Sequence, residues 1–230
     1  MLIGNGLVAK AFGAYAGKDD CVVFASGVSN SKTTNPELYK RETALLKECI
    51  EKHNDKSVLY FSTCSIYDPE EKNSAYIRHK LSIEDYITSH ANQFYIFRVS
   101  NLAGKSDNPN TILNFLFYQV RNGTNFNLWT KACRNIIDVD SVVLIIDFII
   151  RKKIFSNSIT NIANPLNHSV REIVAAIEKF LNKKSDFIEI DKGSCFDIDV
   201  SRVLPIKKEL NISFADDYLN RMLNKYFTNQ

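Results

Sequence analysis

The chain has 230 residues, of which 45% are hydrophobic and 24% are charged, and its formal net charge is +3. This length fits one large domain, or one domain with a small lobe, and the composition is that of an ordinary soluble globular protein. The mild charge, without a clustered basic stripe, argues against nucleic acid as a partner. The apolar stretch Val142 to Ile150 is too short to span a membrane. Because Met1 leads straight into a glycine turn, we expect no secretory signal and a cytoplasmic location.

The cysteine and histidine patterns give no sign of a metal site. The cysteines are five in number, and no two of them form a C-x-x-C pair. We therefore expect reduced thiols of a cytosolic protein and no disulfide framework. The four histidines lack any metal-binding spacing, so no metal is predicted. The five cysteines are Cys21, Cys49, Cys64, Cys133 and Cys195.

Strands and helices alternate along the chain. Leucines recur at helical spacing over 36–53, and Ser169 to Glu172 has the form of a capping box. The alternation predicts a parallel sheet with helices on both faces, and ligands then bind beyond the carboxyl ends of the strands. In chain order we expect a strand at 1–3, a helix to about 16, a strand at 21–25, a helix at 36–53, a strand at 57–61, a helix at 76–89, a strand at 94–99, a helix at 111–121, an apolar helix capped by Asp140 or Ser141, a strand at 159–163, a helix after Ser169, a strand at 187–190 and a helix from 215.

A glycine turn follows the first strand. Gly4, Gly6 and Ala9 fit the dinucleotide fingerprint, in which the first glycine makes the tight turn and the second lets the backbone approach a pyrophosphate. The small third residue lets the helix pack on the strand. The fingerprint also expects an acidic residue at the end of the second strand, where it binds a ribose. Here Asp19 and Asp20 precede that strand and no acid ends it.

A hydroxyl, a tyrosine and a lysine form the candidate catalytic group. Thr63 ends a strand, and Tyr76 and Lys80 are four residues apart on a predicted helix, so they share one face. A nearby ammonium favours the phenolate, which suits a tyrosine that exchanges a proton with a sugar or alcohol oxygen. The pair alone also fits an exposed tyrosine beside a solvated lysine. The position of all three at strand ends, like the glycine turn, favours an active site.

In their order and spacing these motifs resemble the extended short-chain dehydrogenase/reductase family, which comprises nucleotide-sugar epimerases, dehydratases and 4-ketosugar reductases. The resemblance implies an α/β, Rossmann-like, doubly wound parallel sheet with a small C-terminal substrate lobe. Thr63, Tyr76 and Lys80 match the family's catalytic residues. It also implies NAD(P)(H) as cofactor, bound by Gly4, Asn5, Gly6, Leu7, Val8, Ala25, Ser26, Gly27 and Lys80.

The resemblance also implies residues that bind the substrate. Asn101, in an Arg-x-x-Asn-x-x-Gly segment, and Arg134 match positions that lie near the nucleotide diphosphate. Cys64 and Ser65 directly follow Thr63, where the family's sugar dehydratases carry Asp-Glu. A thiol and a hydroxyl are poor substitutes for acid/base carboxylates, which argues against dehydration.

The chain departs from the family in its cofactor half. If residues 22–27 correspond to the family's fourth strand, the segment with strands two and three is missing. This would explain the absent acid, and it leaves the choice between NAD and NADP open. We expect a dinucleotide-binding domain at 1–163, with 105–135 on its substrate side, and a substrate lobe at 164–230.

The expected function is reduction of a 4-keto group on a nucleotide-linked sugar, with Tyr76 as general acid, Lys80 tuning it and Thr63 polarising the sugar oxygen. Epimerisation of a nucleotide sugar is the first alternative. A degenerate protein that binds a nucleotide sugar without turnover is the second. The resemblance further implies bacterial surface-polysaccharide biosynthesis as the setting and a homodimer built from the helices at 36–53 and 76–89.

Overall fold

The structure is a computed structural model that describes residues 1–106 and 108–228. Its centre is a five-stranded sheet in the order β1-β2-β3-β4-β9, and every pairing in it is parallel. The predicted α/β, doubly wound fold is therefore confirmed. The strands are β1 (Leu2–Ile3), β2 (Cys21–Phe24), β3 (Ser57–Thr63), β4 (Gln93–Val99) and β9 (Ser158–Ile162).

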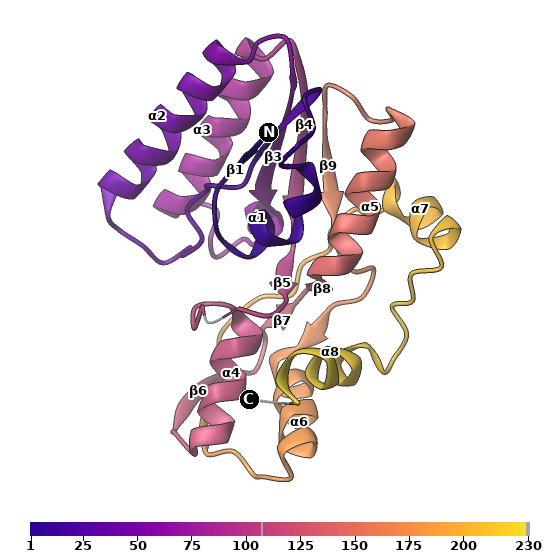
Figure 1. The fold of residues 1–230 in the computed structure, drawn as a ribbon. Helices are drawn as coiled ribbons and strands as arrows, with labels where there is room; N and C mark the ends of the chain where they lie inside the picture. The colour runs from indigo at the N-terminus through magenta and orange to yellow at the C-terminus, as the bar shows by residue number, and fades with distance from the viewer. Residues whose placement is uncertain (107, 229–230) are drawn as a thin grey trace.

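Helices cover both faces of this sheet (Figure 1). Successive side chains of a strand point to opposite faces, and β2 shows this alternation clearly. Phe24 packs into one buried cluster with residues of α2 and α3, whereas Val23 packs into another with residues of α5. The helices are α2 (Pro36–Lys52) and α3 (Ala75–His90) on one face, and α1 (Leu7–Ala11) and α5 (Val139–Lys152) on the other.

The sheet is shortened at β1. Among the described residues, β1 pairs with β2 alone, so its other edge is free of any further strand. Doubly wound dinucleotide-binding sheets commonly run 3-2-1-4-5-6, with two more strands beyond the first. The predicted loss of strands two and three is thus confirmed, and the strand end that would carry the ribose-binding acid is absent with them.

A smaller region lies below the carboxyl ends of the strands (Figure 1). It shares one continuous hydrophobic core with the α1 and α5 face of the sheet, because Phe97 and Ile145 belong to the same buried cluster as Phe117 and Ile177. Its strands form three two-stranded pairs: β5 (Asn101–Ala103) with β8 (Ile136–Asp138), β7 (Cys133–Arg134) with β10 (His168–Ser169), and β6 (Phe126–Trp129) with β11 (Phe187–Ile190). Its helices are α4 (Ile112–Asn122), α6 (Val170–Leu181) and α8 (Tyr218–Phe227), and α7 (Val203–Glu209) lies beside α5.

The first residues of α5 and α6 show how capping side chains set the start of a helix. The capping box is present, since Ser169 Oγ accepts from the Glu172 N–H and the Glu172 carboxylate accepts from the Ser169 N–H. The cap of α5 was predicted too late in the chain, because Asp138 accepts from the Asp140 N–H and the helix starts at residue 139. No helix in the described ranges is long and apolar enough to cross a membrane.

Candidate active site

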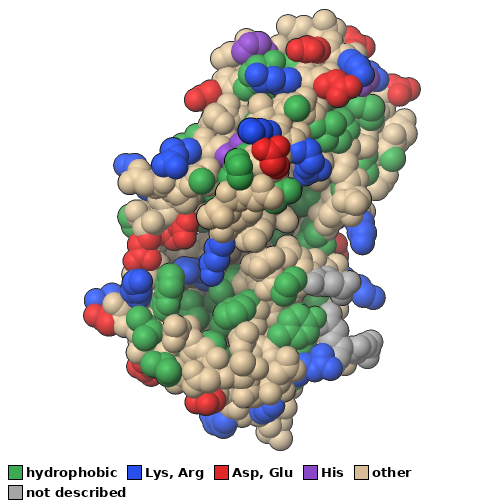
Figure 2. Space-filling model, turned by 90° about the vertical axis from the view of Figure 1, so that its left-hand side faces the viewer, with side chains coloured by type: hydrophobic (Ala, Val, Ile, Leu, Met, Phe, Trp, Pro, Cys, Tyr) green, Lys and Arg blue, Asp and Glu red, His purple; other side chains and the backbone are tan. Residues whose placement is uncertain are grey.

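A cavity of about 620 Å³ lies at the carboxyl ends of the strands. In Figure 2 the surface is hollowed between the half that carries α2 and α3 and the half that carries α4 and β6. Its volume lies within the range of small-molecule sites. The glycine turn, the ends of β2, β3 and β4, helix α3 and residues near 106–112 and 196–198 line it. Among the lining residues that the structure describes, the charged ones are Arg41 and Lys80.

The glycine turn has one glycine that packs and one that faces open space. Gly4 has φ +128°, and a Cβ there would lie 2.3 Å from the Ala25 carbonyl oxygen, so β1 can approach β2 only with glycine. A Cβ on Gly6 would meet nothing within 4 Å. Gly6 lines the cavity with Asn5, Leu7 and Val8, whereas Gly4 supports the turn from behind.

Thr63 lines the cavity at the end of β3, as predicted, together with Cys64 and Ser65. Its hydroxyl oxygen accepts a hydrogen bond from the Ser65 N–H at 3.0 Å, which leaves the hydroxyl proton available to a ligand. The Cys64 thiol is buried and donates to the Arg98 carbonyl at 3.0 Å. Burial raises the pKa of Cys64 to about 12, so this thiol cannot serve as an acid or base near neutral pH.

Tyr76 and Lys80 line the same cavity from α3. Ser74 caps this helix, accepting from the Ile77 N–H at 3.2 Å, so Tyr76 lies in the first turn and Lys80 one turn further along. The Lys80 ammonium lies 5.8 Å from the centre of the Tyr76 ring. The structure thus brings Thr63, Tyr76 and Lys80 to one cavity with the glycine turn.

Glu42 on α2 is a site residue that the sequence interpretation missed. Its side chain is fully buried, and Lys80 donates to Glu42 Oε1 at 2.9 Å. Lys80 also donates to the Tyr60 hydroxyl at 2.9 Å. The sequence held one signal for it: Glu42 interrupts the apolar face of α2, four residues before Leu46. A carboxylate at such a position needs a buried partner.

A second buried ion pair supports the floor of the cavity. The buried Glu84 carboxylate of α3 accepts two hydrogen bonds from the Arg98 guanidinium, at 2.5 and 3.0 Å. It also accepts one from the Ser62 hydroxyl, at 2.5 Å. Arg98 also donates to the Tyr67 hydroxyl at 3.1 Å. Ser62 immediately precedes Thr63, so this network fixes the end of β3 against α3 and β4.

The two residues predicted near the diphosphate are placed differently. Asn101 lines the cavity, and its amide donates to the Asn135 carbonyl at 2.9 Å. Arg134 does not line the cavity in this structure; its guanidinium donates to the Cys133 carbonyl at 2.7 Å. Asn135, the next residue, does line it.

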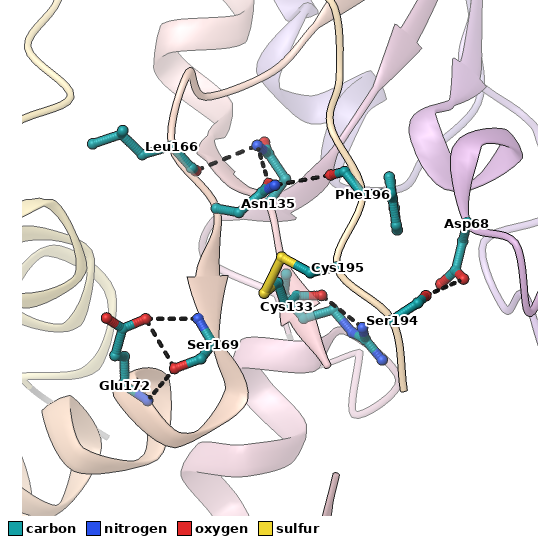
Figure 3. The surroundings of a disulfide bond; sticks show 11 residues. Asp68, Cys133, Asn135, Leu166, Ser169, Glu172, Ser194, Cys195 and Phe196 are labelled. Atoms are coloured by element: carbon teal, nitrogen blue, oxygen red, sulfur yellow. Dashed lines mark hydrogen bonds between the residues drawn. A yellow bond between two sulfur atoms is a disulfide. The ribbon is translucent and has the colours of Figure 1, made fainter. Parts of the chain in front are cut away.

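The segment 191–200 contributes Phe196 and Ile198 to the lining of the cavity, and a disulfide ties this segment to β7 (Figure 3). Cys133 and Cys195 are joined, which corrects the expectation that all five cysteines are reduced. The Cys133 N–H donates to the Ser194 carbonyl, and the two Cα atoms of the disulfide lie 4.7 Å apart. The bond closes over 62 residues of sequence, so no spacing motif could reveal it. Phe196 of this segment lines the cavity.

The structure thus has a Rossmann-like parallel sheet with Thr63, Tyr76 and Lys80 together in a cavity at the carboxyl ends of its strands. Residues 8–163 match the NAD dependent epimerase/dehydratase family, and the chain belongs to this family. No curated protein sequence matches the chain significantly.

Solved structures with the same fold include enzymes from several bacteria. UDP-glucose 4-epimerase of Thermus thermophilus, in complex with NAD, has a TM-score of 0.72 and 17% identity over 96% of this chain and 81% of its own. The dTDP-glucose 4,6-dehydratase of Bacillus anthracis, also with NAD, has a TM-score of 0.71 and 17% identity over 97% and 78%. RMD of Pseudomonas aeruginosa, with NADPH, has a TM-score of 0.63 and 14% identity over 85% and 89%.

Proposed function

We propose that the protein is an NAD(P)-dependent oxidoreductase that reduces a 4-keto group on a nucleotide-linked sugar. One observation carries the proposal: Thr63, Tyr76 and Lys80 line the same cavity as the glycine turn. Membership of the epimerase/dehydratase family supports the class of reaction and the cofactor. The complexes of the similar structures with NAD or NADPH support it as well.

The residues at the glycine turn fit a dinucleotide. The open space over Gly6 leaves its backbone accessible to a pyrophosphate, and Ala25, Ser26 and Gly27 line the cavity beside it at the end of β2. Arg41 lines the cavity as well, and its guanidinium suits a phosphate group. When bound, the nicotinamide supplies the hydride.

The protein's own part in the reaction is binding and proton transfer. Tyr76 would give its phenolic proton to the carbonyl oxygen of the sugar as that oxygen gains negative charge. Thr63 would donate a hydrogen bond to the same oxygen, and the Lys80 ammonium would stabilise the phenolate left on Tyr76. These three groups are on two elements, β3 and α3, that the Ser62–Glu84–Arg98 network holds together.

The residues after Thr63 favour reduction over dehydration. Elimination of water needs an acid/base pair near the sugar. The Cys64 thiol donates a hydrogen bond to the Arg98 carbonyl and has a strongly raised pKa, and Ser65 carries only a hydroxyl. Both positions therefore suit sugar contact better than proton transfer.

Cofactor titration tests this proposal first. We expect the protein to quench or shift the fluorescence of NADH or NADPH with a dissociation constant below the millimolar range. Failure of both to bind would reject the oxidoreductase function. With a 4-keto nucleotide sugar, we expect oxidation of the reduced cofactor, followed by its near-ultraviolet absorbance. Conversion of a nucleotide sugar into an isomer of unchanged mass, without net use of the cofactor, would instead identify epimerisation, whereas a dehydration would also regenerate the cofactor but would lower the mass by one water.

A variant then assigns the proton donor. Tyr76→Phe should lower kcat by about 100-fold or more, because a positioned general acid contributes roughly that factor or more. Tyr86→Phe, on the same helix but outside the residues that line the cavity, is the matched control and should keep the parent rate. A Tyr76→Phe variant as fast as the parent would remove the tyrosine from the mechanism.

A further inference from the structure

The carboxylate of Glu42 joins three other parts of the fold in the interior. Oε1 accepts from the Tyr60 hydroxyl of β3 at 2.7 Å and from Lys80 at 2.9 Å. Oε2 accepts from the Val28 N–H after β2 at 2.7 Å and contacts His79 Nε2 at 3.0 Å. Glu42 is 0% exposed and Lys80 is 2% exposed, so water does not screen this pair.

The network uses two of the three donors of Lys80. An ammonium has three N–H groups, and here Glu42 and the Tyr60 hydroxyl each accept one. One donor is left, and Lys80 lines the cavity beside Tyr76. The bonds to Glu42 and Tyr60 therefore fix how the ammonium is turned and leave one N–H group for a ligand.

The loop after β2 contacts the same pair. A Cβ on Gly27 would lie 2.8 Å from Lys80 Nζ and 3.1 Å from Glu42 Oε1, so the backbone there closely approaches both charges. The Val28 N–H bond to Glu42 holds this loop in place. Because Gly27 lines the cavity, Glu42 connects the cofactor side of the site to the helix that carries Tyr76.

Stability is a weak reason for such a pair. Replacing a buried ion pair by well-packed apolar residues is often neutral or stabilising. The neighbouring contacts of α2 with α3 and the sheet are apolar, with Leu46 and Ile83 in one buried cluster. A buried charged pair next to the candidate catalytic residues therefore calls for a functional reason.

We propose that Glu42 is a positioning residue that keeps the Lys80 ammonium charged and turned so that one N–H group faces the ligand. This proposal deepens the proposed function and rests on it for its effect on catalysis. The groups that face the carboxylate are the Val28 backbone, Tyr60, His79 and Lys80. Beyond them, the Tyr39 ring lies 4.7 Å from the ring of His79.

The first test needs neither cofactor nor substrate. Protein with ¹³C-labelled lysine is titrated by NMR, and the Lys80 signal is assigned by its loss in Lys80→Met. In Glu42→Gln, which keeps the shape and removes the charge, we expect Lys80 to titrate about one pH unit or more below the parent, because a buried ammonium without its counter-ion loses its proton more readily. Equal titration in both proteins would overturn the proposal.

Two further variants separate charge from packing. Leu46→Ala, one turn along α2 and in the apolar core, should lower stability while Lys80 titrates as in the parent. A shift in Leu46→Ala as large as in Glu42→Gln would reduce Glu42 to a packing role and overturn the proposal. If Glu42→Gln does not fold, Glu42→Asp draws the carboxylate back by one methylene and should give a smaller shift in the same direction; no shift would again overturn it.

Kinetics then test the effect on the reaction. At saturating cofactor, Glu42→Gln should lower kcat by about tenfold or more in mildly alkaline buffer, change KM for the sugar by less than about threefold, and move the alkaline limb of the kcat profile to lower pH. Leu46→Ala should keep the parent profile. A Gln variant with the parent kcat and profile would overturn the positioning role. If the parent binds neither NADH nor NADPH, the proposed function fails, while the NMR titration still decides whether Glu42 controls Lys80.

Discussion

A side chain on Gly4 would collide with the backbone of Ala25, because a Cβ would lie 2.3 Å from that carbonyl oxygen. The same residue has φ +128°, which side chains rarely tolerate. Gly6, two residues later, has ordinary backbone geometry and open space around it. The two glycines of one motif therefore have different tasks: Gly4 permits the approach of β1 to β2, and Gly6 leaves room for a ligand.

This difference predicts that substitution by alanine affects stability at Gly4 and cofactor binding at Gly6. Gly4→Ala should lower the free energy of unfolding by about 3 kcal/mol or more, through strain and steric conflict. Gly6→Ala should stay within about 1 kcal/mol of the parent, yet bind NAD(P)H at least several-fold more weakly. Urea denaturation and cofactor titration of both variants measure this. Equal stability of the two variants would contradict the assignment.

Because Cys133 and Cys195 form a disulfide, we predict that a reductant lowers the stability of the protein. A disulfide that closes 62 residues limits the unfolded chain and contributes up to about 4 kcal/mol. Dithiothreitol should therefore lower the melting temperature of the parent by about 10 °C. The double variant Cys133→Ala/Cys195→Ala should melt at that lower temperature with or without reductant.

A control and a binding measurement complete this experiment. Cys49→Ala removes a buried free thiol and should keep the sensitivity to reductant. Because Phe196 lines the cavity next to the disulfide, reduction should also raise KM for the sugar substrate. Identical melting of the parent with and without reductant would show that the bond does not form in solution.

Much of this fold could be predicted because its signals are local. Strand and helix periods, the glycine turn and the Ser169–Glu172 box each lie within a few residues, and the carboxyl ends of parallel strands meet at one edge. That rule alone places Thr63, Tyr76 and the glycine turn together. The small pairs β5–β8 and β7–β10 escaped prediction, since strands of two or three residues carry too little pattern.

The remaining parts depend on contacts between distant segments. Glu42 and Lys80 are 38 residues apart, and the two bonded cysteines are 62 apart, so neither pairing has a sequence spacing of its own. Family resemblance could suggest a ligand role for Arg134, but the cavity in this structure is lined by its neighbour Asn135. A motif predicts where a residue lies along the chain, but the direction of its side chain depends on the packing around it.

We predict that removal of the Thr63 hydroxyl lowers catalysis much more than it lowers stability. Thr63→Val keeps the volume and removes the hydroxyl, so it loses both the bond from the Ser65 N–H and the donor to the substrate oxygen. We expect kcat to fall by about 100-fold and the unfolding free energy to fall by only about 1 kcal/mol. Thr63→Ser keeps the hydroxyl and should restore most of kcat. A Val variant with the parent kcat would exclude Thr63 from the reaction.

The buried Glu42 carboxylate predicts a specific loss of stability in acid. Desolvation by burial would raise its pKa, but the hydrogen bond with His79, the charge of Lys80 and the bonds from Val28 and Tyr60 together outweigh it and lower the pKa to about 2. A carboxylate whose pKa is lower in the folded state stabilises the protein above its unfolded pKa, here 4.5, and loses that contribution as the pH falls toward 2.

Denaturation at several pH values measures this contribution by comparison with Glu42→Gln, which has no titrating group at the position. The shift corresponds to on the order of 3 kcal/mol, of which about 2 kcal/mol should be lost between about pH 6 and pH 3. Glu42 is the titrating group that the variant removes, so the difference in slope between the two proteins measures the contribution of its carboxylate. The parent should therefore lose stability more steeply than the variant over this interval. Parallel curves for the two proteins would show that the carboxylate is not held by this network in solution.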